Sequence, residues 1–122
     1  YVSDVPEIAW DLIELTEKPL TIIYEGARNL APSLIAADGS IGIRITGELF
    51  SRELCKQFRK PIVSTSANIS GTPAPSRFQQ ISGEIREKVD YVVTCRQKEQ
   101  SETESSSIIR LGRNGTIQII RK

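Results

Sequence analysis

Residues 61–71 read Pro-Ile-Val-Ser-Thr-Ser-Ala-Asn-Ile-Ser-Gly. The apolar run at its start predicts a short strand over residues 61–64, and the octet from Ser64 to Gly71 carries five polar side chains. Ser, Thr and Asn offer short donors and acceptors that can hold an anion or a polar substrate. Ligands of α/β proteins usually bind at strand ends. The same residues also form turns, and spacing alone slightly favours a turn over a ligand site.

Helical and strand patterns alternate on both sides of this stretch. Apolar spacing predicts helices over about residues 4–17 and 48–60, the first opened by a capping box of Asp4 and Glu7. Ser76 and Gln79 resemble a second capping box for one or two helical turns, and residues 27–39 predict a loop with a short helical turn. Further strands are expected at residues 20–24, 40–45, 91–94, 107–111 and 116–120.

The order of these elements favours an α/β layered domain with a mixed sheet. Asn114-Gly115 is a strong hairpin signal between the last two strands. Residues 96–104 are polar and charged and are expected to form a mobile loop.

Composition narrows the classes of function. The 122 residues are one domain's worth of chain or less, and 16 basic against 15 acidic side chains leave a net charge of +1. Bulk charge therefore does not draw the protein to nucleic acid or membrane. With no His and no CxxC, a metal site or thiol–imidazole site is not expected, and Cys55 and Cys95 are expected to be unpaired thiols. No secretory or membrane signal occurs, so no membrane partner and a cytoplasmic location are expected.

Arg44 is the first candidate binding residue outside the 61–71 stretch. It lies between Ile43 and Ile45, close to the expected core, where an unpaired guanidinium is costly. Its planar fork suits a carboxylate or a phosphate. A salt bridge to Asp38 or Glu48 is an equally good reading of the sequence.

The remaining candidates are polar residues at strand ends. Each is ordinary by itself, but together they would form a pocket rich in hydroxyls with two guanidinium groups: Ser64, Ser66, Asn68, Ser106, Ser107, Arg44 and Arg121. No His and no carboxylate pair is present to serve as general acid or base, so no catalytic residue is assigned. Such a pocket offers orientation and charge neutralisation, which phosphoryl and nucleotidyl transfer need. Neither a Walker-type loop nor GxGxxG occurs.

Residues 61–71 resemble the signature of the YrdC-like family, the threonylcarbamoyl-AMP synthases. Residues 18–23 are similar to the family's Pro-Gly-Pro-Leu-Thr strand, with Lys18 in place of Gly, and residues 40–45 to its Thr-Val-Gly-Val-Arg strand. Residues 105–109 match its Pro-Ser-Thr-Ile segment more loosely, and Arg121 stands where the family ends its last strand. The pieces occur in the family's order.

The resemblance implies a YrdC-like fold, a twisted mixed sheet with flanking helices. Because the family's Lys-x-Arg motif for the ATP phosphates is missing and no Met is present, residues 1–122 are expected to be the C-terminal portion of a single such domain. The fragment by itself is expected to be inactive.

The implied reaction joins L-threonine, bicarbonate and ATP into threonylcarbamoyl-AMP and pyrophosphate, with Mg²⁺ on the phosphates, for tRNA threonylcarbamoyladenosine modification. The family thus implies a nucleotidyltransferase that serves tRNA indirectly. By resemblance, threonine would be bound by Arg44, Ser64 and one of Ser106 or Ser107, and the nucleotide by Ser40, Ser66, Asn68 and Arg121. The alternative is an RNA-binding YrdC-like module without synthase activity, against which the near-neutral charge argues mildly.

Overall fold

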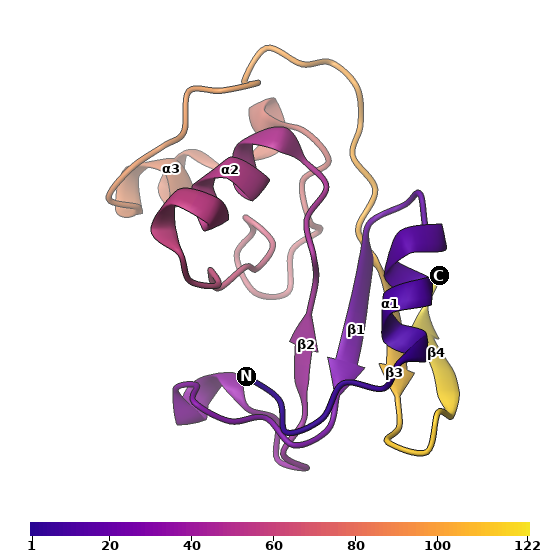
Figure 1. Cartoon of the computed structure of the whole chain (residues 1–122). Coiled ribbons are helices and arrows are strands. Elements are labelled where there is room, and N and C mark those ends of the chain that lie inside the picture. Colours follow the sequence, from indigo (N-terminus) through magenta and orange to yellow (C-terminus); the bar gives the residue numbers. More distant parts are fainter. The chain divides into compact units, whose positions relative to one another are not determined.

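The computed structural model describes residues 1–122 and divides them into two compact units. The first unit contains residues 1–47 and 106–122, and the second contains residues 48–105. Figure 1 labels the helices and strands, which follow one another as α1 (Ile8–Leu15), β1 (Leu20–Tyr24), β2 (Ile41–Ile43), α2 (Leu49–Phe58), α3 (Gly83–Lys88), β3 (Ser107–Leu111) and β4 (Ile117–Arg121). Two short 3₁₀ turns lie at Pro32–Leu34 and Phe78–Gln80.

The first unit is built on a four-stranded mixed sheet in the order β2-β1-β3-β4. β1 pairs antiparallel with β2 and parallel with β3, whereas β3 and β4 are antiparallel. Strands β1 and β3 can be parallel neighbours because the whole second unit separates them in the sequence. The predicted α/β class with a mixed sheet is therefore confirmed.

One face of this sheet packs against α1 and forms the core. Side chains alternate along a strand, so every second residue of β1 and β3 points to the helix. The buried residues follow that alternation and are joined by Ala9 of α1: Val2, Ala9, Ile22, Tyr24, Ile109 and Leu111. Figure 1 shows α1 lying alongside β1 and β3. The other face of the sheet carries Thr21, Gly42 and Arg110 together with Ile23 and Ile108.

Helix α1 begins later than the sequence predicts. It starts at Ile8 instead of residue 4, and its N-cap, Glu7, makes no side-chain cap hydrogen bond. The proposed Asp4–Glu7 capping box is therefore wrong. The Pro6 carbonyl accepts from the Ala9 amide at 2.9 Å, so the entry into the helix is a backbone turn around the proline.

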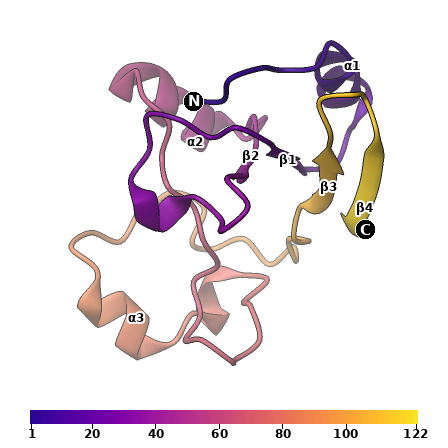
Figure 2. The ribbon, with the colours of Figure 1, turned by 90° about the horizontal axis from the view of Figure 1, so that it is seen from below.

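The C-terminal hairpin matches its prediction closely. β3 and β4 pair from Leu111 with Ile117 onward, and the Gly112 amide donates to the Thr116 carbonyl at 2.9 Å across the turn. Gly115 has a φ of 81°, which glycine adopts at little cost. Figure 2 shows the two strands joined by this turn.

The second unit contains α2 and α3. Glu48 is the N-cap of α2, and its carboxylate accepts from the Phe50 and Ser51 amides at 3.1 and 2.7 Å. Those hydrogen bonds hold the pKa of Glu48 at about 2, with the Ser51 amide as the largest cause. The Ser82 side chain caps α3 in the same manner by accepting from the Ile85 amide.

Three expectations for the second unit are wrong. Residues 61–64 and 91–94 form no strand, because neither apolar run finds a partner strand; Val63 and Tyr91 remain 67% and 75% exposed. The capping partner of Ser76 is Gln80 and not Gln79, since the Gln80 side-chain oxygen accepts from the Ser76 amide at 2.8 Å.

None of the helices is both long and apolar enough to cross a membrane.

Candidate functional site

The sheet face opposite α1 carries most of the predicted binding residues of the first unit. We call it the polar face and define it by the residues that alternate with the core positions: Thr21 and Ile23 of β1, Gly42 of β2, Ile108 and Arg110 of β3, and Ser106 at the start of β3. Alternation from Gly42 assigns Ser40 and Arg44 to the same face.

Arg44 is exposed just beyond the end of β2, and the structure gives its guanidinium no hydrogen bond or ion pair. The sequence places Arg44 close to the core; that expectation is wrong. Both carboxylates that could have paired with it are engaged elsewhere: Asp38 with Arg110 at 3.0 Å and Glu48 with Arg96 at 3.0 Å. The alternative of a salt bridge to Asp38 or Glu48 is therefore also wrong. A guanidinium without a carboxylate partner has its whole donor fork available to a ligand.

Ser40 is buried, with 2% of its surface exposed. Its hydroxyl donates to Asp38 Oδ1 at 2.6 Å, and its amide donates to the same oxygen at 3.1 Å. These hydrogen bonds, with the Arg110 ion pair, hold the pKa of Asp38 below its usual range. Ser40 thus orders the turn that leads into β2, and a contact to ATP stays a prediction.

Ser106 and Ser107 lie on opposite sides of the sheet. The Ser106 hydroxyl lies 2.8 Å from the Thr21 hydroxyl on the polar face. Ser107 pairs with Leu20 and alternates with the buried Ile109, so its side chain belongs to the α1 face. Of the two serines left open by the sequence, Ser106 is the one that shares a face with Arg44.

Arg121 is tied to the same serine. Its guanidinium donates to the Ser106 carbonyl from Nε at 3.0 Å and from Nη2 at 2.6 Å. The pairing of β3 with β4 shifts register between Ile108 and Ile109 of β3. As a result, Arg121 of β4 lies opposite Ile108. The side chain remains exposed, and a nucleotide contact by Arg121 stays a prediction.

The other three predicted residues, Ser64, Ser66 and Asn68, belong to the second unit. Both serine side chains are exposed. The side-chain nitrogen of Asn68 donates to the backbone carbonyls of Thr72 and Ile69, at 2.8 and 3.2 Å, and so closes a tight loop. Its side-chain oxygen is buried without a partner, which is unusual for an amide and leaves an acceptor unused. The octet therefore forms a turn, and its ligand role is untested.

Thr21 is the site residue that the sequence did not single out, whereas strand alternation already puts Gly42 on the face of Ser40 and Arg44. A Cβ added at Gly42 would lie 3.3 Å from the Thr21 methyl carbon, so Gly42 leaves the flank of Thr21 uncovered. Both residues lie inside the segments that carry the family resemblance, at 18–23 and 40–45. The signal that could have found Thr21 is the alternation of its own strand, in which Thr21 points away from Leu20 and Ile22.

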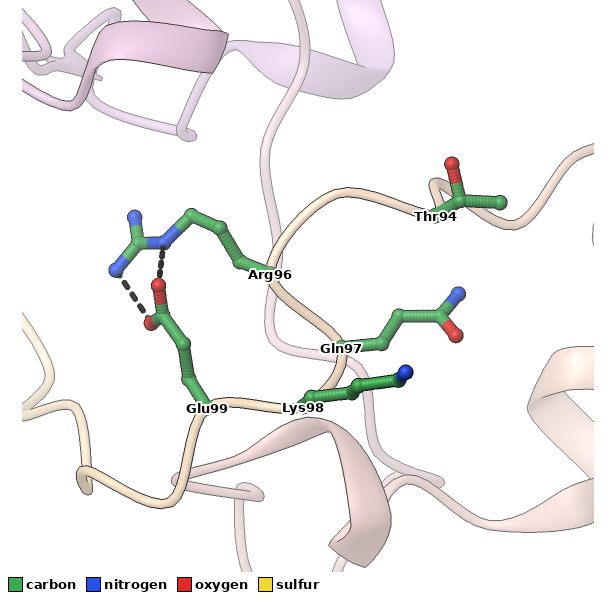
Figure 3. A pocket seen from close by; sticks show the side chains of 5 residues that line it. All are labelled: Thr94, Arg96, Gln97, Lys98 and Glu99. Atoms are coloured by element: carbon green, nitrogen blue, oxygen red, sulfur yellow. Dashed lines mark hydrogen bonds and ion pairs between the residues drawn. The ribbon is translucent and has the colours of Figure 1, made fainter.

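A pocket of about 400 Å³ lies in the second unit, lined by Thr94, Arg96, Gln97, Lys98 and Glu99 (Figure 3). The Arg96 guanidinium donates to both oxygens of Glu99, at 2.6 and 2.7 Å. The Arg96 charge is thereby neutralised within the pocket.

The polar face can orient a polar ligand and neutralise a carboxylate. Asp38, the carboxylate that pairs with Arg110 of this face, is occupied by Ser40 and Arg110, so it does not offer the free carboxylate oxygens that a protein-bound Mg²⁺ prefers. Neither does the face contain a base for proton transfer.

Comparisons with known proteins agree with the resemblance found in the sequence. The chain matches, over residues 1–122, the Sua5/YciO/YrdC family, described as "Telomere recombination". It is 40% identical over 93 residues to a protein of Methanocaldococcus jannaschii named as a candidate threonylcarbamoyl-AMP synthase; this covers 76% of the chain and 42% of the relative.

Two bacterial relatives are named threonylcarbamoyl-AMP synthase. The chain is 29% identical to the protein of Photobacterium profundum, in a match that covers 62% of the chain and 40% of that relative. It is 32% identical to the protein of Vibrio parahaemolyticus, in a match that covers 85% of the chain and 54% of that relative. The chain thus spans about half the length of the curated relatives it matches. No solved structure matches it significantly. Since the family match covers every residue, this chain belongs to the Sua5/YciO/YrdC family.

Proposed function

We propose that the protein carrying this chain is a threonylcarbamoyl-AMP synthase, an ATP-dependent nucleotidyltransferase. The single observation that best supports this is the free guanidinium of Arg44 on the polar face, beside the hydroxyl pair of Thr21 and Ser106. A free guanidinium binds a carboxylate through two parallel hydrogen bonds, and neighbouring hydroxyls can hold an ammonium or hydroxyl group. An α-amino acid with a hydroxyl side chain presents all of these groups.

The proposed roles follow the positions of the residues. Arg44 binds the carboxylate of L-threonine, and Ser106 contacts the same substrate. Ser64 is assigned to threonine by resemblance alone. Ser66, Asn68 and Arg121 contact ATP. Ser40 is assigned to the nucleotide by resemblance alone, and its buried hydroxyl donates to Asp38, so a contact to ATP requires that hydrogen bond to rearrange.

The proposed reaction asks the protein for positioning. The threonine nitrogen and bicarbonate form a carbamate, with loss of water. A carbamate oxygen then forms a bond to the α-phosphorus of ATP while the bond from that phosphorus to the bridging oxygen breaks, and pyrophosphate leaves with the electron pair. Holding the reactants in line and neutralising charge accounts for such a step without a protein nucleophile. Mg²⁺ is proposed to arrive with the ATP phosphates, and no step is assigned to it.

The test measures pyrophosphate release by the full gene product that contains this chain, with ATP, bicarbonate and L-threonine. Release that requires all three, and that Arg44→Ala abolishes, is the expected result. Arg28→Ala is the matched control, since Arg28 is also an exposed arginine of the first unit without a side-chain partner. Release that does not depend on threonine would contradict the proposal. The same assay on residues 1–122 alone tests the prediction that this stretch is inactive.

RNA binding without synthase activity is the alternative function. The net charge of +1 does not favour it, because nonspecific RNA binders carry an excess of basic side chains. Salt-sensitive binding of tRNA, by a protein whose pyrophosphate release does not depend on threonine, would establish this alternative.

Cytoplasmic location and an indirect role in tRNA modification stay predictions.

A further inference from the structure

We infer that Thr21 is a positioning residue for the amino acid substrate: its hydroxyl fixes the direction of the Ser106 hydroxyl on the polar face. The inference rests on the proposed function, since it concerns the same threonine site. Thr21 is uncharged and lies on β1, whereas none of the residues proposed to bind threonine lies on that strand.

The geometry around Ser106 carries the inference. Thr21 Oγ1 and Ser106 Oγ lie 2.8 Å apart, a good hydroxyl–hydroxyl distance, and both side chains are half-buried. The Ser106 backbone is held separately by the two hydrogen bonds from Arg121 to its carbonyl. The main chain of Ser106 is thus fixed from β4 and its side chain from β1.

The strand register places Thr21 between Ser106 and Arg44. β1 and β2 pair as Ile22 with Ile43 and Ile23 with Gly42, so Thr21 and Arg44 are each one residue beyond the Ile22–Ile43 pair, at the same end of the two strands. On the other side, Thr21 pairs with Ile108, two residues beyond Ser106. Arg44 just beyond β2, Thr21 in β1 and Ser106 just before β3 therefore lie in this order across the sheet.

The chemistry of a hydroxyl pair explains what Thr21 contributes. Each hydroxyl has one proton, so within the pair one oxygen donates and the other accepts. If Thr21 donates, the Ser106 proton is free to be donated to a carboxylate; if Ser106 donates, its lone pairs are free to accept from an ammonium or hydroxyl group. In both cases the Ser106 hydroxyl has one direction instead of three rotamers. Loss of the Thr21 hydroxyl removes that restriction while Ser106 stays in place.

The test substitutes Thr21 in the full gene product and measures KM separately for L-threonine and for ATP. Thr21→Val keeps the β-branched shape that suits a strand and removes the hydroxyl. We expect the KM for L-threonine to rise roughly three- to tenfold, the loss of one directed hydrogen bond, with the KM for ATP and kcat nearly unchanged. Thr21→Ser restores the hydroxyl and should restore the wild-type KM. If Thr21→Val does not fold, Thr21→Ala removes the same hydroxyl and is judged by the same numbers.

A matched control and a double variant separate positioning from general stability. Thr116→Val removes another threonine hydroxyl of the same unit, one that donates to Asn114 in the hairpin turn, and should leave the KM for L-threonine unchanged. In the double variant Thr21→Val with Ser106→Ala, the loss should equal that of Ser106→Ala alone, because Thr21 acts only through Ser106.

The outcomes distinguish the two levels of the proposal. If the activity of the wild-type protein does not depend on L-threonine, both the proposed function and the role of Thr21 are wrong. A wild type that responds to threonine, with an unchanged KM in Thr21→Val or additive losses in the double variant, overturns the role of Thr21 and leaves the proposed function intact.

Discussion

Asp38 and Arg110 form an ion pair at 3.0 Å between the turn before β2 and strand β3. The pair bridges two strands that are not neighbours, since β1 lies between them. The ion pair engages one of the two carboxylates that the sequence offers to Arg44, so Asp38 does not neutralise the Arg44 guanidinium.

Replacing Ser40 by alanine should destabilise the first unit. The Ser40 hydroxyl is buried and donates to Asp38, and loss of such a hydrogen bond costs about 1 kcal/mol. For a chain of 122 residues that corresponds to a fall in Tm of about 4 °C. Thermal unfolding followed by circular dichroism measures it. Ser33→Ala, at an exposed serine without a hydrogen bond, is the control. An unchanged Tm in Ser40→Ala would show that the buried hydroxyl is not a structural group.

The same variant separates the two roles assigned to Ser40. If the hydroxyl only orders the turn, a titration of Ser40→Ala with ATP well below its Tm should give the wild-type affinity. A weaker affinity at that temperature would support the nucleotide contact that the family resemblance implies.

Gly115→Ala should weaken the β3–β4 hairpin. The φ of 81° at Gly115 is a left-handed conformation, which costs an alanine about 1 kcal/mol. Chemical denaturation measures the loss in the free energy of unfolding. Gly47→Ala is the matched control, because Gly47 has no positive φ and open space around it. Equal effects of the two substitutions would mean that the conformation of the turn does not require glycine.

Acid should loosen the start of α2. The Ser51 and Phe50 amides hydrogen-bond the Glu48 carboxylate and hold its pKa at about 2, below its ordinary 4.5. A lowered folded-state pKa gives a stabilisation that is complete above pH 4.5 and is lost as the pH falls toward 2. Amide hydrogen exchange at Phe50 and Ser51 should therefore lose protection, relative to the intrinsic rate, over this window. In Glu48→Gln, which lacks the carboxylate, a protection change of equal size in the same window would assign the loss to other groups.

The strands of the first unit could be predicted because each has a partner. Residues 20–24 and 107–111 were expected as strands and form β1 and β3 with the predicted bounds. Residues 61–64 and 91–94 show the same apolar, β-branched character, yet form no strand. Composition reports that a segment suits a sheet, but a strand exists only where a neighbour completes its hydrogen bonds.

The candidate site could be predicted in its residue types and only partly in its arrangement. Arg44 and Ser106 are readable from the sequence, but the choice between Ser106 and Ser107 depends on which face each side chain takes. That choice follows from the pairing of Leu20 with Ser107, a contact between residues far apart in the chain. Likewise, the sequence alone does not decide whether Arg44 pairs with Asp38 or Glu48. The structure shows that Asp38 pairs with Arg110 and Glu48 pairs with Arg96.

The most direct test of the central claim is a calorimetric titration of L-threonine into the full gene product, with ATP, Mg²⁺ and bicarbonate present. The measurement compares wild type with Arg44→Ala and with Arg44→Lys, which keeps the charge but lacks the planar fork. We predict a threonine-dependent heat in the wild type that is lost in Arg44→Ala and strongly weakened in Arg44→Lys, with Arg28→Ala unchanged. An Arg44→Ala variant that binds L-threonine as tightly as the wild type would contradict the account.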